Sequence, residues 1–214
     1  MSQIVVVDYG MGNLRSVAKA IEHVADSHNV IISSDANEIA NADRVVFPGQ
    51  GAAKDCMREL AERKLEQTVL KAAREKPFLG ICMGLQVLLD YSEENQGVDC
   101  LGLYKGHVHN FSSELKSDQG EKLKIPHMGW NTLQQTGDHP LWRGIENNSR
   151  FYFVHSYYID PEDKSLCAAT TQYGIEFVSA IARDNVFAVQ CHPEKSARDG
   201  LQLLKNFAQW NGQQ

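Results

Sequence analysis

The regular alternation of β-branched runs with amphipathic stretches over the first 90 residues constrains the fold of this chain more than any other feature. Residues 4–7, 30–33, 44–47 and 78–81 are short apolar runs of the kind that form buried parallel strands. Apolar residues at helical spacing fill the intervals, beginning with residues 14–24. This order predicts a doubly wound α/β fold, with a mainly parallel sheet and helices on both of its faces.

The helical segments have recognisable starts and ends. Asn13 stands before the first of them and is predicted to cap it. Residues 53–74 have a mostly helical pattern, and Pro77 breaks the chain before the next strand. Another helix is expected to begin within residues 84–89, and residues 197–210 are predicted to close the chain as an amphipathic helix.

The second half of the chain has a different pattern. Residues 101–133 contain short alternating runs separated by glycines, and residues 151–189 contain at least four more strand-like runs. Tyr173-Gly174 is predicted to form a hairpin turn, and hairpins indicate an antiparallel extension at one edge of the sheet. The polar segment 112–122 is the expected loop. Because no linker or repeat interrupts the pattern, we expect a single domain over residues 1–214.

Composition excludes several classes of function. The net charge is −6, whereas nucleic acid binding requires a positive surface. The five cysteines are scattered and include no C-x-x-C pair, which argues against a zinc site or a disulfide framework and favours a reducing, cytoplasmic location. The first ten residues have no basic region, and their apolar run is too short for a signal peptide or a membrane span.

The stretch Phe78–Gln86 joins a hydrophobic strand, the pattern Gly-x-Cys-x-Gly and a helix start. This is the nucleophile-elbow arrangement with cysteine in place of serine. Side chains two residues on either side of Cys82 would collide in so tight a turn, which explains Gly80 and Gly84. The turn would expose the thiol at a helix N-terminus, where the helix dipole favours the reactive thiolate. A small buried cysteine at a strand end is the alternative, and the flanking glycines argue against it.

Residues 186–190 form another apolar run, which ends in Cys191-His192-Pro193-Glu194. Side chains at i and i+2 of an extended chain point the same way, so His192 and Glu194 would face one side and Cys191, a predicted core residue, the other. An imidazole beside a carboxylate can take a proton from a thiol while it stays correctly oriented. Both this segment and the elbow follow predicted parallel strands, and they would meet at the edge that carries active sites in open α/β sheets.

A third strand ends in the glycine-rich turn Pro48-Gly49-Gln50-Gly51. Backbone N–H groups in such a turn can face a developing oxyanion, although the segment alone is better explained as a plain strand-to-helix loop. The pair His107-x-His109 could place two metal ligands on one strand face. No third ligand is recognisable nearby, so we expect exposed strand histidines, no metal and no cofactor.

Together these segments closely resemble the class I, triad-type glutamine amidotransferases, a family of flavodoxin-like architecture. The motifs, in the family's order and over essentially the whole chain, are Pro-Gly-x-Gly at 48–51, Gly-x-Cys-x-Gly-x-Gln at 80–86 and His-Pro-Glu at 192–194. The resemblance implies that Cys82 is the nucleophile that forms a glutamyl thioester with L-glutamine. It also implies that His192 is first the base and then the acid that protonates departing ammonia, and that Glu194 orients His192.

The same resemblance implies roles for residues around the nucleophile. The N–H groups of Met83, Gln50 and Gly51 would stabilise the oxyanion, and the Gly49-Gln50 peptide would be a switch. Many relatives carry valine at position 50, but glutamine there leaves the backbone donor intact. The residues expected to hold the substrate glutamine are Gln86, His155, Ser156 and Tyr157.

Two further stretches resemble the glutaminase subunits of imidazole glycerol phosphate synthases, which act in histidine biosynthesis. They are Asp-Tyr-Gly-x-Gly-Asn at 8–13 and Pro-His-Met-Gly-Trp-Asn at 126–131. The resemblance implies a heterodimer with a TIM-barrel cyclase subunit that receives the ammonia. Asn13, Trp130 and Lys195 are the residues expected on the docking face.

Three alternatives remain open at this point. One is a different triad amidotransferase of the anthranilate, aminodeoxychorismate or pyridoxal phosphate type, which the segment 126–131 argues against. Another is a catalytically inactive subunit that only regulates its partner, which the intact Cys82, His192 and Glu194 argue against. The last is a cysteine hydrolase or deglycase of flavodoxin-like architecture, for which the combination of His-Pro-Glu with Pro-Gly-x-Gly is unsuited.

Overall fold

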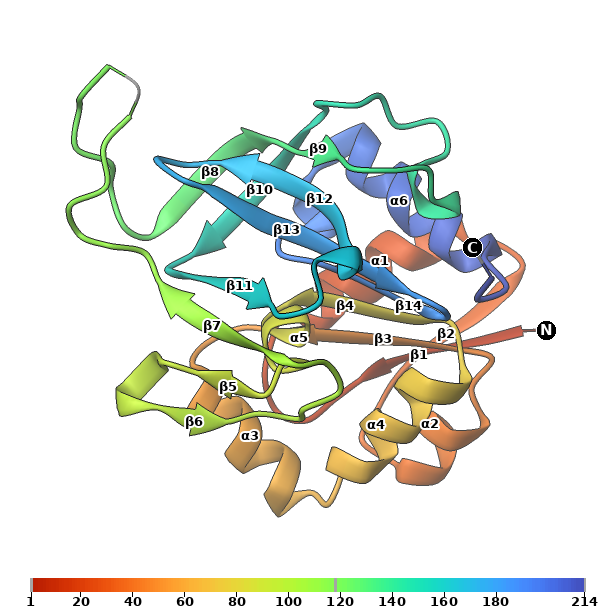
Figure 1. The fold of residues 1–214 in the computed structure, drawn as a ribbon. Helices are drawn as coiled ribbons and strands as arrows, with labels where there is room; N and C mark the ends of the chain where they lie inside the picture. Colours follow the sequence, from red (N-terminus) through yellow and green to blue (C-terminus); the bar gives the residue numbers. More distant parts are fainter. Residues whose placement is uncertain (1, 118, 214) are drawn as a thin grey trace.

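The computed structural model describes residues 2–117 and 119–213, and a sheet of twelve strands runs through its centre (Figure 1). One half of the sheet is parallel, as the sequence predicts, and its strand order is β2–β1–β3–β4–β14. The bounds of these strands are β1 Ser2–Val7, β2 His28–Ser33, β3 Arg44–Gly49, β4 Phe78–Cys82 and β14 Val186–Val189.

The other half of the sheet is the expected extension and is mostly antiparallel. It continues from β14 through β13, β11, β7, β5 and β6, while β12 pairs with β13 and β9 pairs with β12. The bounds are β5 Tyr91–Ser92, β6 Val98–Asp99, β7 Gly106–Asn110, β9 Gln134–Gln135, β11 Tyr157–Pro161, β12 Cys167–Gln172 and β13 Glu176–Arg183. The predicted hairpin turn at Tyr173-Gly174 joins β12 to β13.

A separate antiparallel pair, β8 (His127–Thr132) with β10 (Arg150–His155), lies outside the main sheet. Its register sets His127 opposite His155 and Trp130 opposite Tyr152. The sequence indicates strands here but not that they form a sheet of their own. Strand β10 continues through Ser156 into β11 of the main sheet, so this pair is connected directly to the antiparallel extension.

Helices cover both faces of the parallel half. Ile4 and Val6 of β1 pack in one buried cluster with α1 and α6, whereas Val5 and Val7 pack in another with α2, α3 and α4. This alternation of side chains along a strand is what produces two hydrophobic layers. The helix bounds are α1 Leu14–Val24, α2 Ala36–Asn41, α3 Ala53–Glu62, α4 Glu66–Glu75, α5 Met83–Gln86 and α6 Ala197–Gln209. The described residues also form the short 3₁₀ segments η1 Glu94–Gln96, η2 Pro140–Trp142, η3 Lys164–Leu166 and η4 Pro193–Lys195.

Three helix predictions need correction. The expected helix over 53–74 is two helices, because the backbone at Lys64 turns to a φ of 57° between α3 and α4. The helix expected within 84–89 is the single turn α5, which ends at Gln86. Asn13 does occupy the N-cap position of α1, but its side chain makes no capping hydrogen bond. The short helix α2, which Asp35 caps, was not predicted.

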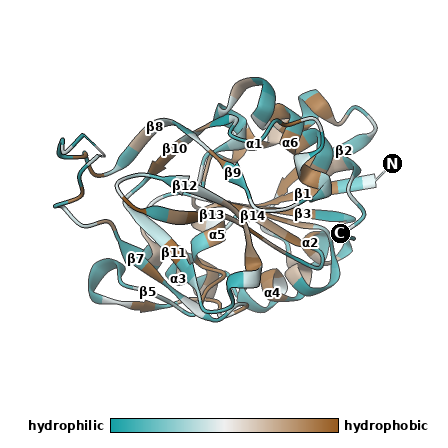
Figure 2. Cartoon of the chain, turned by 45° about the horizontal axis from the view of Figure 1, so that its top comes forward, coloured by the Kyte–Doolittle hydropathy of each residue, from teal (hydrophilic) through white to brown (hydrophobic). Residues whose placement is uncertain are grey.

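Hydropathy follows this layered arrangement. Hydrophobic residues are concentrated in the central strands, whereas the long connection between β7 and β8 is mostly hydrophilic (Figure 2). That connection contains the predicted loop, whose described residues make one isolated bridge between Lys116 and Lys122. Among the helices that the structure describes, none is both long and apolar enough to cross a bilayer.

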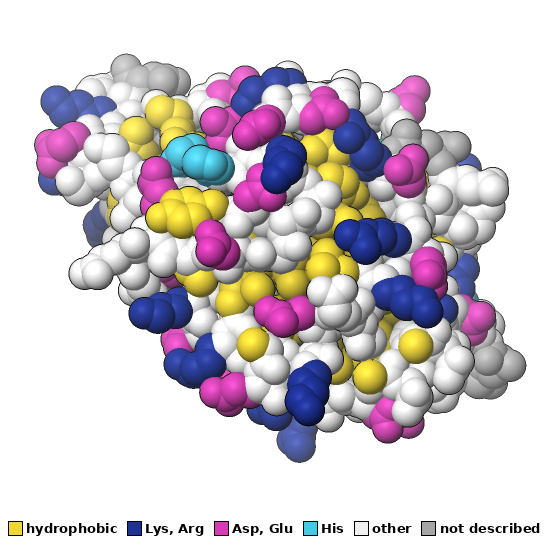
Figure 3. Space-filling view, turned by 60° about the horizontal axis from the view of Figure 1, so that its bottom comes forward, with side chains coloured by type: hydrophobic (Ala, Val, Ile, Leu, Met, Phe, Trp, Pro, Cys, Tyr) yellow, Lys and Arg dark blue, Asp and Glu magenta, His cyan; other side chains and the backbone are white. Residues whose placement is uncertain are grey.

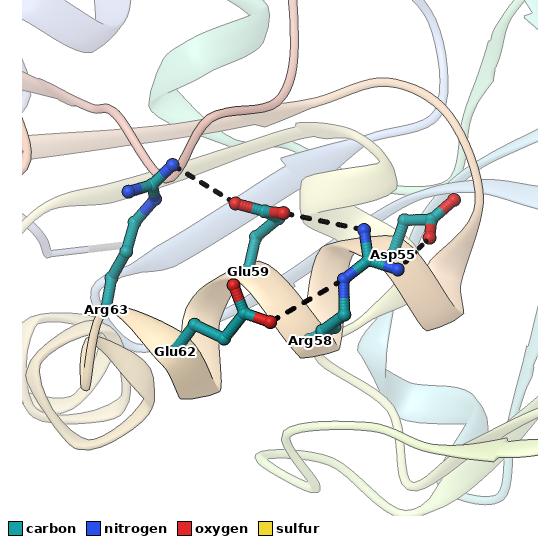
Figure 4. A network of polar contacts seen from close by, with 5 residues as sticks. All are labelled: Asp55, Arg58, Glu59, Glu62 and Arg63. Carbon is teal, nitrogen blue, oxygen red and sulfur yellow. Dashed lines mark hydrogen bonds and ion pairs between the residues drawn. The ribbon is translucent and has the colours of Figure 1, made fainter.

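Charged side chains on α3 form a network at the surface (Figure 4). Arg58 contacts Asp55 at 2.7 Å and Glu59 at 3.4 Å, and Glu59 also contacts Arg63 at 3.1 Å. The Arg63 guanidinium packs against the turn after β1, where a Cβ on Gly10 would lie 2.6 Å from it. Acidic and basic side chains are interspersed over the face that Figure 3 presents.

The cluster between α1, α6 and the sheet allows a test of the fold. Ile21 is fully buried there, whereas its neighbour Glu22 is exposed. We expect Ile21→Ala to lower the free energy of unfolding by about 2–5 kcal/mol, because it removes apolar contacts and leaves a cavity. Glu22→Ala is the matched control and should change it by less than about 0.5 kcal/mol. Urea unfolding measures both, and equal small effects would contradict the packing described.

Candidate active site

A pocket of about 430 Å³ opens at the carboxyl ends of the central parallel strands. This is the edge where open α/β sheets place their active sites. The predicted residues that line it are Gln50, Gly51, Cys82, Met83, Gln86, His155, Ser156, Tyr157, His192 and Lys195. Glu94, Pro126 and Val154 complete the lining. Asn13 and Trp130 do not line it, and Glu194 lies behind His192.

Cys82 lies at the junction of β4 and α5 in a strained backbone conformation, with φ at 55° and ψ at −108°. The two flanking glycines are required by contacts in the structure. A Cβ on Gly84 would lie 1.8 Å from the carbonyl oxygen of Phe47, and a Cβ on Gly80 would lie 2.7 Å from the carbonyl oxygen of Gly84. Because α5 is only one turn long, it supplies less of a helix dipole to the thiol than the sequence suggests.

His192 follows β14, which is paired in parallel with β4, so the imidazole comes to the same edge of the sheet as Cys82. Its Nδ1 atom lies 2.9 Å from Oε1 of Glu194, and both side chains are almost completely buried. The backbone conformation that brings these two side chains together differs from the extended one expected from the sequence. Residues 193–195 form the 3₁₀ turn η4 rather than an extended chain, and this turn brings the carboxylate back to the ring. Cys191 is fully buried in the core, as predicted.

The electrostatics of His192 reflect its neighbours. Burial by itself lowers the pKa of the imidazole, but hydrogen bonds and charges from Cys82 and Glu194 outweigh burial and raise the pKa to about 10. Among the described residues the buried Nε2 atom has no hydrogen-bond partner, and Cys82 is the neighbour on that side that raises the pKa of the ring. The site therefore favours a protonated imidazole between a sulfur and a carboxylate.

Two buried side chains that the sequence did not indicate support this arrangement. Ser196 Oγ donates to the His192 carbonyl oxygen at 2.6 Å and accepts from the Tyr152 N–H at 2.9 Å. Gln190 Nε2 lies 3.6 Å from the Cys82 sulfur. Both follow β14, and nothing in an isolated glutamine or serine distinguishes it from an ordinary polar residue near a strand end.

The glycine-rich turn lies beside the nucleophile because β3 and β4 are paired in register. Gly49 is directly opposite Cys82, and the chain then turns at Gly51 with φ at 92°. A Cβ on Gly49 would come within 2.3 Å of the Tyr9 hydroxyl and 2.7 Å of the Met83 Cβ, so only glycine fits there. Gln50 and Gly51, which follow Gly49 in the chain, line the pocket beside Cys82.

The opposite wall comes from the segment between β10 and β11. His155, Ser156 and Tyr157 all line the pocket. The Tyr157 carbonyl oxygen accepts hydrogen bonds from Gln86 Nε2 at 3.0 Å and from the His155 ring at 2.8 Å. Gln86 also donates to Gln190 Oε1 at 2.9 Å, so this predicted substrate residue is itself part of the wall.

The remaining candidates are distributed as follows. Trp130 is 44% exposed on β8, Lys195 is exposed at the pocket edge with its ammonium 5.8 Å from the Tyr152 ring centre, and Asn13 is half-buried.

His109, one of the two histidines considered as metal ligands, contacts Glu93 at 2.8 Å. Over the described residues no cluster of three or more histidine, cysteine or acidic side chains could hold a metal ion.

The family model for glutamine amidotransferase class-I matches residues 5–210. This chain therefore belongs to the class-I glutamine amidotransferases. It is 59% identical to the imidazole glycerol phosphate synthase subunit HisH of Hydrogenovibrio crunogenus, over 98% of this chain and 97% of that protein. It is also 53% identical to the subunit of the same name in Pseudomonas putida, over 99% of both chains.

Solved structures support the same fold at low identity. The structure of PurLQS from Thermotoga maritima matches with a TM-score of 0.71 at 20% identity, over 96% of this chain and 97% of that one. A glutamine amidotransferase from the same organism matches with a TM-score of 0.62 at 16% identity, over 92% of this chain and 78% of that one. The similarity therefore extends over nearly the whole α/β architecture.

The buried histidines generate a prediction about pH. Burial lowers the pKa of His127 and of His139 to about 4 and that of His155 to about 3. Because the unfolded chain takes up these protons below pH about 6.5, these three histidines cost the folded state no stability above that pH, and they lower its stability as the pH falls towards about 4. Each histidine should add up to about 1.4 kcal/mol per pH unit to this loss.

Urea unfolding at several pH values between about 7.5 and 4.5 measures the slope, and His139→Asn is the variant for comparison. Asparagine can keep an acceptor for the Leu141 N–H, which His139 Nδ1 now accepts at 3.1 Å, but it does not titrate. We expect a shallower slope for this variant. An unchanged slope would show that His139 is protonated in the folded protein.

Proposed function

We propose that this chain is the glutaminase subunit of an imidazole glycerol phosphate synthase. In this proposal it hydrolyses L-glutamine to glutamate and ammonia and delivers the ammonia to a cyclase subunit in histidine biosynthesis. The observation that carries the proposal is the identity of 53–59% over 97–99% of the chain to proteins that are named as subunits of that synthase. A pocket that contains Cys82 and His192 supports it chemically.

The reaction begins with the Cys82 thiol. His192 holds the proton that the Cys82 thiol has given up, and the resulting thiolate attacks the side-chain amide carbon of glutamine to form a tetrahedral intermediate. His192 then returns the proton to the amide nitrogen, the C–N bond breaks, and ammonia leaves a glutamyl thioester. Water attacks the thioester with His192 again as base, which releases glutamate and restores the thiol. Glu194, 2.9 Å from Nδ1, holds the ring and stabilises its charge.

The negative oxygen of each tetrahedral intermediate requires hydrogen-bond donors fixed in advance. The N–H groups of Met83, Gln50 and Gly51 are our candidates. Met83 is the first residue of α5, and its N–H is among the unpaired donors at a helix start. Gln50 and Gly51 line the same pocket on the side of β3. The glutamine side chain at position 50 is not required, because only its backbone would take part.

Glutamine brings a carboxylate and an ammonium group that the pocket must also bind. The wall formed by His155, Ser156 and Tyr157 would hold the substrate through its backbone, with Gln86 beside it. Glu94, which the sequence did not single out, supplies a carboxylate to the same lining. We propose that it binds the substrate ammonium while it also accepts the Ala53 N–H at 2.6 Å.

Ammonia in neutral water is mostly ammonium, which is not nucleophilic, so its transfer requires a dry path into the partner. We propose a TIM-barrel cyclase as that partner, in a heterodimer, with Asn13, Trp130 and Lys195 on the docking face. Exposure of Trp130 and of the neighbouring Met128, at 44% and 61%, supports an interface there. The whole chain would act as one cytoplasmic glutaminase domain without a cofactor.

The first experiment is to measure glutamate release from glutamine by this protein, alone and with the cyclase subunit and its nucleotide ligand. We expect strong activation by the partner. Cys82→Ala should abolish glutamine hydrolysis, because no other group in the pocket can form the thioester, while the complex still assembles and uses added ammonia. Loss of the ammonia-dependent reaction as well would point to a role of Cys82 in folding or docking.

A second experiment compares the two residues behind the nucleophile. His192→Ala removes the base itself, whereas Glu194→Ala removes only the group that orients it. We therefore expect kcat to fall by more for His192→Ala than for Glu194→Ala, with the difference about tenfold or larger. Steady-state kinetics of the complex measure this, and the reverse order would contradict the assigned roles.

A further inference from the structure

A chain of hydrogen bonds leads from the pocket wall into β8. The His155 Nδ1 atom lies 2.8 Å from the Tyr157 carbonyl oxygen, and His155 Nε2 lies 2.8 Å from His127 Nδ1. His127 Nε2 lies 3.1 Å from Asn131 Nδ2, which also donates to the Gln172 carbonyl oxygen at 2.8 Å. The two ends of the chain are therefore a carbonyl oxygen in the pocket and a backbone position on β12.

Only one arrangement of protons satisfies all of these contacts. A carbonyl oxygen can only accept, so His155 carries its proton on Nδ1 and accepts at Nε2. His127 must then donate from Nδ1 and accept at Nε2, where the Asn131 amide donates. The amide orientation is fixed independently, because Asn131 Oδ1 accepts the Thr132 N–H at 2.7 Å. Each member of the chain thus has a single role.

The surroundings keep both rings neutral and in place. His127 and His155 are 3% and 6% exposed, and burial lowers the pKa of each, to about 4 and about 3. The His127 ring is stacked between Phe153, with ring centres 5.0 Å apart, and Tyr173, with ring centres 4.0 Å apart. Stacking keeps the ring from moving out of its plane, and the hydrogen bonds at its two nitrogens restrict movement within the plane, so a displacement of Asn131 would displace His155 as well.

The contact between His127 and Asn131 requires a departure from ideal strand geometry in β8. Four residues of ideal strand would separate their Cα atoms by about 13 Å, which is more than these two side chains can bridge. Gly129 lies between them with φ at 129°, and nothing lies within 4 Å of the place where its Cβ would be. We attribute the contact to the backbone conformation of this glycine, which a residue with a Cβ rarely adopts.

We propose that His127 and Asn131 are positioning residues for glutamine binding. They act through His155 on the Tyr157 carbonyl, where the His155 and Gln86 donors converge, and so they hold the pocket wall in its binding geometry. This inference rests on the proposed function of the pocket. Neither residue lines the pocket, and on the other side of the same strand Met128 and Trp130 are exposed.

The arrangement of protons is tested directly by long-range ¹H–¹⁵N correlation spectra of the histidine rings at pH about 7.5, where both rings would be neutral. We expect His127 and His155 to be neutral and protonated at Nδ1. A ring protonated at Nε2 in either residue would overturn the proposed chain, whatever the activity of the protein.

The effect on the pocket is tested by glutamine binding to the Cys82→Ala complex with its partner subunit, in which no turnover occurs. We expect Asn131→Leu and His127→Leu each to raise the Kd for glutamine about tenfold, because each removes one link. His127→Asn can keep a donor for His155 and should have a smaller effect. Thr132→Val is the matched control, because this exposed side chain takes no part in the chain and the substitution keeps the backbone N–H that Asn131 accepts, so Kd should change less than about twofold.

The same substitutions in the active complex should raise KM for glutamine about as much as Kd and leave kcat within about threefold, because they do not touch the reacting groups. Unchanged Kd in both leucine variants would overturn this inference and leave the glutaminase function intact. Failure of the Cys82→Ala complex to bind glutamine at all would overturn the proposed function and this inference with it. A loss of kcat without a change in KM would show a general structural effect and would also overturn it.

Discussion

The strained backbone at Cys82 is the constraint on which the rest of the site depends. A residue with φ at 55° and ψ at −108° holds its side chain outward at the end of a strand, and this conformation must be stabilised by its surroundings. The stabilisation comes from close packing, because Gly84 lies against the Phe47 carbonyl and Gly80 lies against Gly84 and Ala188. The nucleophile, the turn after β3 and the strand β14 are thus packed into one unit.

Pairing of the strands then brings together the remaining groups. The three neighbouring parallel strands β3, β4 and β14 each end at the same edge and each contribute one element of the site. They contribute the glycine-rich turn, the thiol and the imidazole in that order across the sheet. Since the sheet core is fully buried on both faces, the relative positions of these groups are fixed before any ligand arrives.

The sequence predicted the parallel strands, and nine of the thirteen residues that line the pocket are ones it assigned to the site, whereas Lys195 was assigned to the docking face. Some of the nine, such as Gln86 and His155, were assigned only through the family resemblance. Glycines around a cysteine and β-branched runs report directly on backbone geometry. The features that the sequence did not predict have a common physical cause, because each of them depends on contacts with residues that are distant in the chain. The 3₁₀ turn η4 brings Glu194 to His192, and Gln190, Ser196 and Glu94 acquire their importance only through partners that lie far along the chain or across the pocket. The separation of β8 and β10 into a sheet of their own is equally invisible to alternation alone, because alternation does not specify which strands pair.

The place of β14 has a consequence for the synthesis of the protein. This strand lies between β4 and β13, and the buried Gln190 that follows it contacts a cysteine 108 residues earlier in the chain. At about 5–20 residues per second, a ribosome needs about 5–20 s to make that interval. During this time β4 has only one of its two neighbours, and the thiol has no imidazole beside it. A nascent chain therefore cannot consume glutamine until β14 and His192 have been made and have paired with the elbow.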